Sequence, residues 1–457
     1  MTDENVTVKE FLIPSGVENV LQTLEAQGFE AWLVGGCVRD HLLGKIPKDY
    51  DVATNASTCQ VMSVFEGVRV IETGVKHGTV TVISGGIPVE VTTFRTDGAY
   101  SDGRHPDSVR FASDIRDDLG RRDFTVNAIA YSPRRGYVDL FGGGSDLRSG
   151  VIRCVGDPDV RFGEDALRIL RAMRFASVLG FAVEDGTAAS IHRCKGLLSK
   201  IAVERVTKEF TGLLCGANAA GVLREYADVV ALIIPPCAAM FGFEQHNPYH
   251  DRDVWEHTLG VVQAVPPVTV MRLAALLHDV GKPLCFTVDE SGRGHFYGHE
   301  TIGADIVRHV LDSYIRVDRH TGERVLFLVE HHGEPILPDR KIMRRRLARY
   351  GEEPLRQLIA LHRADTAGQA ADAVSERPAE LEEAERLLDA LVEESACTTL
   401  SGLAVRGGDL MAMGIPKGPM IGRILNELLR EVCAETLENS GQALRARASQ
   451  LYSRMDG

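Results

Sequence analysis

A change in the spacing of apolar residues near residue 158 constrains the fold of this chain more than any other feature. Before it, short apolar or alternating runs indicate strands near residues 30–34, 49–53, 68–72, 78–84 and 88–94. After it, strand signals nearly vanish and helical periods dominate, as in residues 164–180, 203–216 and 380–394. The fold class predicted is therefore α+β, with an α/β head over residues 1–150 followed by an extended all-α region.

The length of the chain implies several domains. Its 457 residues exceed what a single hydrophobic core normally organises. Pro235-Pro236 is a natural joint within the helical part. We predict four parts, over residues 1–150, 151–235, 236–375 and 376–457.

The charge and cysteine content limit the partners and the compartment. A formal net charge of −13 argues against a general affinity for polyanions, so RNA would have to bind through local basic patches. One candidate is the run of Lys341, Arg344, Arg345, Arg346 and Arg349, although a solvated helix face is nearly as good an interpretation. Nine cysteines without a CxxC pair favour reduced thiols. The first residues do not resemble a signal peptide, and no apolar run approaches the ~18 residues of a membrane span. We expect a cytoplasmic protein without a membrane partner.

The strand at residues 49–53 carries the first candidate site. Asp49 and Asp51 are two residues apart, so their carboxylates point to one face of a strand and suit a hard cation such as Mg²⁺. Glu90, in a later strand, is a candidate third carboxylate. Upstream, Gly35 and Gly36 open a helix that brings Arg39 one turn in, an arrangement suited to phosphate. Alone, Asp-x-Asp would more often be a turn or a cap.

The order of several motifs makes the site much more specific. LVGGCVRDHLLGKIPKDYDVAT, RHPDSVRF, RRDFTVNAIAY, GEDALRILRAMRFASVLGF and IAVERVTKEF follow one another across residues 30–215. Together they resemble the class II tRNA nucleotidyltransferases and bacterial poly(A) polymerases. The resemblance implies that Asp49 and Asp51 hold Mg²⁺, activate the RNA 3′-hydroxyl and orient the triphosphate. It also implies a nucleotide-binding set formed by Gly36, Arg39, Arg122, Asp123, Asn127, Asp165, Arg168, Arg171 and Arg174. Glu90 rests on the residue pattern alone.

Asp165 and Arg168 predict which nucleotides are chosen. Placed three residues apart on one helix, they would present a carboxylate acceptor beside a guanidinium donor. Cytosine and adenine offer an amine beside a ring acceptor and match that pattern, whereas uracil and guanine place a carbonyl against the carboxylate. The pair thus predicts selection of CTP and ATP without a nucleic-acid template, a role that the resemblance also implies. The alternative is an ordinary ion pair on a helix surface.

The segment 96–109 bears on the product. It is rich in Gly, Asp and Ser and is predicted to be a long loop. In the family that this chain resembles, such a segment accompanies addition of the complete CCA end to tRNA.

A second candidate site lies in the helical region. His257, His278-Asp279, His299, His331-His332 and Asp365 resemble the ligand series of the HD phosphohydrolase superfamily, with HDVGK as its most specific portion. We predict metal ligands at His257, His278, Asp279 and Asp365, with His299 and His331 as further candidates. Such donors suit Mg²⁺ or a divalent transition metal. The resemblance implies hydrolysis of phosphoesters at RNA ends, and the alternative is an HD scaffold without activity.

The function predicted is a CCA-adding tRNA nucleotidyltransferase that uses CTP and ATP, with a second, HD-borne hydrolase activity. Residues 403–429 resemble the C-terminal body segment of longer family members, where tRNA is held. The alternatives are a poly(A) polymerase or a CC- or A-only enzyme of the same fold, an HD phosphohydrolase acting on RNA ends, and a catalytically dead RNA-binding protein. The state of assembly, monomer or homodimer, is left open.

Overall fold

The computed structural model describes residues 11–72, 74–75, 78–97, 109–246, 252–369, 377–396, 400, 402–433 and 436–455. The chain forms two compact units, Met1–Glu330 and His331–Gly457. Most of the loop predicted at residues 96–109 lies outside the described residues. The four-part division predicted from the sequence stays a prediction.

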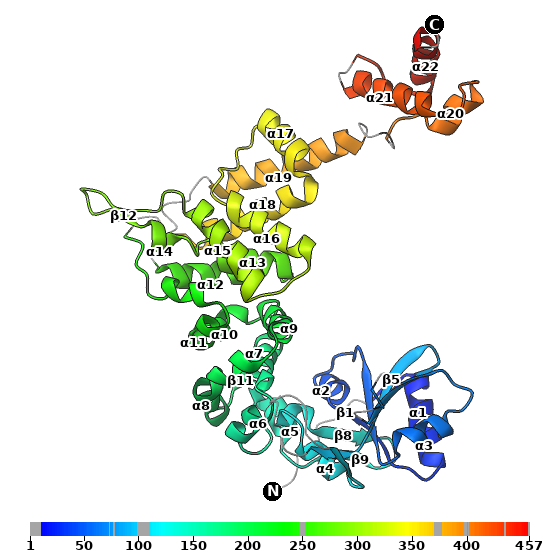
Figure 1. Ribbon diagram of the computed structural model, residues 1–457, viewed down its shortest axis with the longest axis vertical. Coiled ribbons are helices and arrows are strands. Elements are labelled where there is room, and N and C mark those ends of the chain that lie inside the picture. The colour runs from blue at the N-terminus through cyan, green and yellow to red at the C-terminus, as the bar shows by residue number, and fades with distance from the viewer. Residues whose placement is uncertain are drawn as a thin grey trace. The chain divides into compact units, whose positions relative to one another are not determined.

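A mixed sheet of seven strands organises the N-terminal head (Figure 1). Its strands in spatial order are β3 (Val70–Ile71), β4 (Thr79–Ser84), β5 (Ile87–Thr93), β2 (Tyr50–Thr54), β1 (Ala31–Val34), β8 (Ile129–Ser132) and β9 (Gly136–Asp139). β2 and β5 pair in parallel, whereas the other neighbours are antiparallel. All four residues of β1 are buried, so this strand lies in the core of the head. The strands expected from the sequence are confirmed.

Short helices complete the head. They are α1 (Ser15–Ala26), α2 (Gly36–Leu42), α3 (Thr58–Val64), α4 (Ile115–Gly120), the 3₁₀ helix η2 (Thr125–Asn127) and α5 (Gly143–Ser149), beside a two-stranded ribbon of β6 (Arg95–Asp97) and β7 (Val109–Phe111). A capping box of Ser57 and Gln60 begins α3. Gly16 in α1 lies so close to the turn after β4 that an added Cβ would be 2.3 Å from the carbonyl oxygen of Ser84. A glycine there lets α1 pack directly against the sheet.

Helices follow almost without interruption in the rest of the first unit. They are α6 (Pro158–Glu164), α7 (Leu167–Leu179), α8 (Asp185–Cys194), η3 (Lys195–Lys200), α9 (Val203–Leu214), α10 (Ala219–Glu225), α11 (Ala227–Ile233), η4 (Pro235–Met240), α12 (Val254–Ala264), α13 (Thr269–Leu277), α14 (Lys282–Cys285), α15 (His299–Ser313) and α16 (Arg319–His331), whose last residue begins the second unit. Two-residue strands pair as β10 (Val151–Ile152) with β11 (Ala182–Val183) and as β12 (Thr287–Val288) with β13 (Gly294–His295). The predicted α+β class, with a helical region after an α/β head, is confirmed.

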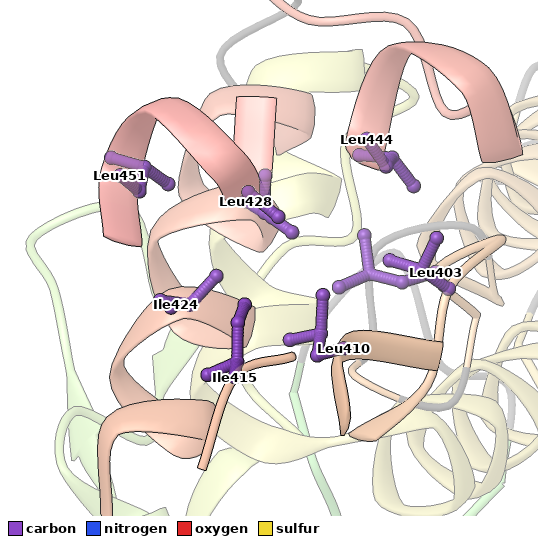
Figure 2. Packing of buried hydrophobic residues seen from close by; sticks show 9 residues of the cluster. Leu403, Leu410, Ile415, Ile424, Leu428, Leu444 and Leu451 are labelled. Atoms are coloured by element: carbon purple, nitrogen blue, oxygen red, sulfur yellow. The ribbon is translucent and has the colours of Figure 1, made fainter. Parts of the chain in front are cut away.

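The second unit contains α17 (Arg340–Tyr350), α18 (Glu352–Ala367), α19 (Arg377–Ala396), α20 (Gly407–Ala412), α21 (Pro419–Cys433) and α22 (Gly441–Met455). α17, α18 and α19 pack against one another. Figure 2 shows that α20, α21 and α22 direct leucine and isoleucine side chains into a shared cluster, which includes the fully buried Leu410, Ile424, Leu428 and Leu444. The C-terminal helices therefore have a hydrophobic core of their own. Across the described residues, none of the helices is both long and apolar enough to cross a membrane.

Candidate active site and metal centre

Strand register places two of the predicted carboxylates side by side. Asp51 on β2 is the direct partner of Glu90 on the parallel strand β5. Asp49 is exposed and immediately precedes β2. Residues in register on neighbouring strands project from the same face of the sheet, so Asp51 and Glu90 share a face.

The charged form of the Asp51 carboxyl group is disfavoured by its surroundings. Its burial, together with the negative charges of Glu90 and Asp49, raises the pKa of Asp51 from 3.8 to about 6, against the opposing effect of Arg122. Burial is the largest cause, because it removes the charged form from water. A carboxylate that is costly to keep charged among like charges is well suited to bind a cation, which would relieve both the burial and the repulsion.

A glycine brings the backbone against this carboxylate. Gly35 is the N-cap of α2 and has a φ of 72°, in the left-handed region that glycine adopts without strain. A Cβ added there would lie 2.9 Å from Nη1 of Arg122 and 3.8 Å from Oδ2 of Asp51. The helix predicted to open at Gly35 and Gly36 is confirmed, and its beginning lies at the acidic site.

Asp118 positions Arg122, although the sequence analysis did not single it out. It is fully buried in α4, where Oδ2 accepts a hydrogen bond from Nη2 of Arg122 at 3.1 Å and Oδ1 accepts one from Nη2 of Arg121 at 2.7 Å. Burial alone would raise the pKa of Asp118, but the two guanidinium groups outweigh it and hold the pKa below its usual value. Its place four residues before Arg122 was the available signal.

Four of the predicted nucleotide-binding residues form a connected chain of hydrogen bonds. Nη1 of Arg39 donates to Oδ1 of Asn127 at 2.9 Å, and Nδ2 of Asn127 donates to Oδ1 of Asp123 at 3.2 Å. Oδ2 of Asp123 accepts from Nε and Nη2 of Arg171 at 2.8 and 2.6 Å. Burial opposes the charge of Asp123, yet Arg171 and Asn127 lower its pKa to about 2. Residues from α2, η2 and α7 are thereby brought together.

Three guanidinium groups lie over the ring of Phe175. Arg39, Arg171 and Arg174 lie 5.2, 5.3 and 4.4 Å from its ring centroid. Glu209 of α9 fixes two of them, because it accepts a hydrogen bond from Nε of Arg174 at 2.5 Å and lies 3.8 Å from Nη1 of Arg171. Neither Phe175 nor Glu209 was predicted from the sequence. The result is a cluster of three guanidinium groups from α2 and α7, paired with Asp40, Asp123 and Glu209.

The expected pairing of Asp165 with Arg168 on one helix is wrong. α6 ends at Glu164, Asp165 follows in an extended conformation, and its Oδ1 accepts a hydrogen bond from the backbone N–H of Leu167, where α7 begins. Oδ2 of Asp165 instead accepts from Nη2 of Arg205 on α9 at 2.9 Å. Both carboxylate oxygens of Asp165 thus have partners, one in the first turn of α7 and one on α9.

Arg168 is held elsewhere. It is buried, pairs with Glu164 through Nη1, and donates from Nη2 to the carbonyl oxygen of Arg121 at 3.3 Å. Arg205, forty residues after Asp165, was not identified from the sequence. A carboxylate does lie beside a guanidinium here, but the pair is made by Asp165 and Arg205.

Four of the predicted HD ligands meet in the first unit. The ligand atoms of His257, His278 and Asp279 lie within 4.8 Å of one another. Nε2 of His278 is 3.2 Å and Nε2 of His257 is 3.7 Å from Oδ2 of Asp279, while Nε2 of His299 is 3.5 Å from Oδ1. α13 ends at Leu277, so His278 and Asp279 follow directly after that helix. Two buried imidazoles and a buried carboxylate fit a divalent metal in ligand type and spacing.

Lys282 adds a positive charge to this cluster. Its Nζ lies 2.7 Å from Oδ2 of Asp279 and donates to Oε1 of Gln245 at 2.9 Å. Burial would raise the pKa of Asp279, but His278 and Lys282 outweigh it and hold the pKa well below 3.8. Asp279 is therefore a carboxylate at neutral pH, the form that a metal requires.

The other predicted HD ligands lie in the second unit. Of the adjacent pair, His332 is buried, whereas His331 is half-buried and packs its ring against Tyr350. His362, three residues before Asp365 on α18, is also buried, and burial lowers its pKa to about 4, against the opposing charge of Asp365. His362 was missed, although its spacing from Asp365 on a helix is a recognisable signal.

The fold and these sites define a nucleotidyltransferase head followed by an HD domain. Residues 31–153 match the poly A polymerase head domain, residues 254–367 match the HD domain, and residues 336–448 match tRNA nucleotidyltransferase domain 2. Residues 180–229 match the family described as "Probable RNA and SrmB-binding site of polymerase A". The resemblance noted in the sequence is confirmed by these matches.

Among known proteins, the chain is similar to CCA-adding enzymes. It is 47% identical to that of Lactiplantibacillus plantarum over 199 residues, which are 44% of this chain and 48% of the relative. It is 49% identical to that of Limosilactobacillus fermentum over 197 residues, 43% of this chain and 49% of the relative. The chain thus spans about half the length of the curated relatives that it matches.

Solved structures extend the likeness to the fold of the whole chain. The CCA-adding enzyme of Bacillus stearothermophilus in complex with CTP is 29% identical, with a TM-score of 0.61 over 97% of this chain and 98% of that one. The Thermotoga maritima CCA-adding enzyme complexed with tRNA shares the fold at 18% identity, with a TM-score of 0.52 over 97% of both chains.

Proposed function

We propose that this protein is a CCA-adding tRNA nucleotidyltransferase, which builds or repairs the 3′-terminal CCA of tRNA from CTP and ATP without a template. The observation that carries the proposal is the juxtaposition of Asp51 with Glu90 and Arg122 in a head of this family. Similarity to CCA-adding enzymes, one of them in complex with CTP, supports the choice of substrates.

Each group in the head has a role in this reaction. The 3′-oxygen of tRNA attacks the α-phosphorus of the nucleotide, a P–O bond to the β-phosphate breaks, and pyrophosphate leaves with the electron pair. Asp49 and Asp51 would hold Mg²⁺, with Glu90 as a further ligand. When bound, Mg²⁺ would lower the pKa of the 3′-hydroxyl and neutralise negative charge on the triphosphate.

The arginine-rich surface would hold the nucleotide. Arg39, Arg122, Arg171 and Arg174 face phosphates, whereas Asp123 and Asn127 have the acceptors and donors to hold the sugar. The start of α2 at Gly36 places backbone N–H groups beside the carboxylates. Asp165, held by Arg205, offers its carboxylate to the exocyclic amine of cytosine or adenine, and Arg205 offers donors to the adjacent ring acceptor. Arg168, held by Glu164, orients this segment.

The test is incubation with tRNA that lacks its CCA end, with each NTP separately and together, and with product length read at nucleotide resolution. The expected product is complete CCA, made from CTP and ATP alone. Asp49→Ala combined with Asp51→Ala should abolish addition, whereas Glu66→Gln, a surface change in the same head, should not. A long run of AMP, or arrest after CC or before C, would identify one of the related activities instead.

We also propose that the HD domain is a metal-dependent phosphohydrolase that acts on phosphoesters at RNA ends. The cluster of buried His257, His278 and Asp279 with half-buried His299 supports this second activity. Its metal would be Mg²⁺ or a transition metal, and His331 and Asp365 remain further predicted ligands. His278→Ala should remove bound metal and phosphoesterase activity while leaving nucleotide addition intact. The domain is a scaffold if two results are obtained together. The purified wild-type protein holds no metal, and it hydrolyses no 2′,3′-cyclic phosphate at an RNA end when Mg²⁺ or a transition metal is added.

Three further expectations remain proposals. The parts at residues 1–150, 151–235, 236–375 and 376–457 would serve as catalytic head, nucleotide-recognition region, HD domain and tRNA-binding region. The protein would act in the cytoplasm, as monomer or homodimer. The loop expected to favour full CCA addition lies largely outside the described residues, so the product assay decides its relevance.

A further inference from the structure

α17 is the most basic helix in the described part of the second unit. Its eleven residues include Arg340, Lys341, Arg344, Arg345, Arg346 and Arg349 and contain no acid. The chain as a whole carries a net charge of −13, so this helix is a local exception to an acidic background.

Half of these cations are already paired with acids. Arg340 and Arg344 both pair with Glu394 of α19, the latter at 3.4 Å. Arg346 pairs with Glu334 at 3.3 Å. Six cations against two acids leave an excess of four positive charges on the helix.

The other three cations form a row on one face, here called the α17 stripe: Lys341, Arg345 and Arg349. All three are exposed, and none has an acidic partner within salt-bridge distance in the part of the chain that the structure describes. Residues four apart lie above one another on a helix, with about 6 Å between neighbours and about 12 Å along the whole row. The buried Met343 lies on the opposite side of the helix and fixes which face points to solvent.

We propose that the α17 stripe is a binding surface for the phosphate backbone of RNA, and that it holds the tRNA substrate while the head extends its 3′ end. This inference rests on the proposed function for the identity of the RNA. A line of unpaired cations on a rigid helix suits a line of phosphates, because each contact releases condensed counterions. Such contacts position the RNA without reading its sequence.

The chemistry of the exposed face favours RNA over a membrane surface. Helices that bind anionic membranes place large apolar residues beside their cations, so that these enter the lipid. Among the apolar residues of α17, only Ala348 is exposed, and its small side chain gives little apolar area. The stripe thus offers charge without an insertion surface.

The decisive measurement is the salt dependence of tRNA binding without nucleotide, for the full-length protein and a triple variant with Lys341→Ala, Arg345→Ala and Arg349→Ala. Three lost phosphate contacts should reduce the slope of log K against log salt by about 2.7. Between 50 and 200 mM salt the wild type should therefore lose about 40-fold more affinity than the variant. Alanine is a strong helix former, so the variant should keep its helical circular dichroism.

A matched control is available in the same predicted part of the chain, residues 236–375. Arg308, Arg319 and Arg363 are exposed, but each is paired, with Asp305, Glu323 and Glu385 respectively. Replacing these three by alanine removes the same charge and should leave the slope nearly unchanged. Equal slopes for both triple variants, or no change in either, would overturn the proposal.

Two further readouts separate this proposal from the proposed activity. At saturating tRNA the stripe variant should add CMP and AMP at the wild-type rate, with only the KM for tRNA raised. A wild-type protein that binds tRNA through the stripe but adds no CMP would sustain the stripe and remove the activity. Stripe-dependent binding to phosphatidylserine vesicles without binding to tRNA would overturn the RNA assignment.

Discussion

Replacing Asp51 by Asn should stabilise the metal-free protein even as it abolishes nucleotide addition. Burial, Glu90 and Asp49 raise the pKa of Asp51 from 3.8 to about 6, so the folded state holds the proton more tightly than the unfolded chain. The stability from this group is fully present below pH 3.8 and is lost as the pH rises through 6. A shift of roughly two units corresponds to about 3 kcal/mol at pH 8. Asn, which cannot ionise, avoids that cost.

The assay is thermal unfolding in the presence of a chelator, monitored by the tryptophan fluorescence of the head. The chain has two tryptophans, and Trp32 lies on β1 of the head, so a Trp255→Phe background reports on the head alone. For a domain of this size, 3 kcal/mol corresponds to roughly 10 °C in Tm. The advantage of the Asn variant should be present at pH 8 and vanish near pH 4. Glu66→Gln, an exposed acid-to-amide change, is the control.

Adding Mg²⁺ tests the same electrostatic account of Asp51 in the opposite direction. Because a ligand stabilises only the state that binds it, Mg²⁺ should raise the Tm of the wild type more than that of Asp51→Asn. If the Asn variant is no more stable than the wild type at pH 8 without metal, the electrostatic account of this site is incorrect.

Four other changes test the remaining parts of the site and core. Asp118→Asn removes the charge that holds Arg122, so we expect a rise of about tenfold in KM for CTP and ATP and a loss of about 3 kcal/mol in stability, checked by steady-state kinetics and thermal unfolding. Gly35→Ala places a methyl group 2.9 Å from Arg122 at a positive φ, which should cost at least ~1 kcal/mol and lower the rate of CMP addition. Asp165→Ala should admit UTP or GTP, and unchanged selectivity in single-nucleotide incorporation would defeat the base-reading role. Leu428→Ala opens a cavity in the C-terminal cluster and should cost about 2–5 kcal/mol in that unit, measured by urea unfolding.

Much of the architecture could be predicted because it depends on local spacing. The alternation in residues 79–84 specifies a strand with one buried face, and the structure has β4 there with every second residue buried. The prediction that Asp49 and Asp51 share a face uses the same local rule for residues two apart on a strand, but Asp49 itself precedes β2 and only Asp51 lies in that strand. Gly35 could be identified because few other residues tolerate a left-handed turn between a strand and a helix.

The partners of charged side chains could not be predicted in the same way. Ion pairs form between residues that folding brings together, and nothing in the separation of Asp165 and Arg205 reveals that α9 lies beside the start of α7. The expectation for Arg168 failed because a nearer acid, Glu164, satisfied it first. Both errors come from treating the residues between 164 and 168 as one uninterrupted helix.

The sequence by itself determined the α/β head, the helical remainder, the acidic residue Asp51 on a strand and the ordered imidazoles, because each is a matter of residue type and period along the chain. Only the tertiary structure decided that Glu90 stands beside Asp51, that Asp118 holds Arg122, that Arg205 pairs with Asp165, and which cations of α17 are left unpaired. Those outcomes depend on burial and on the distances between segments that are remote in the chain. Electrostatic interactions are strong only where the charges lie close together and burial excludes water.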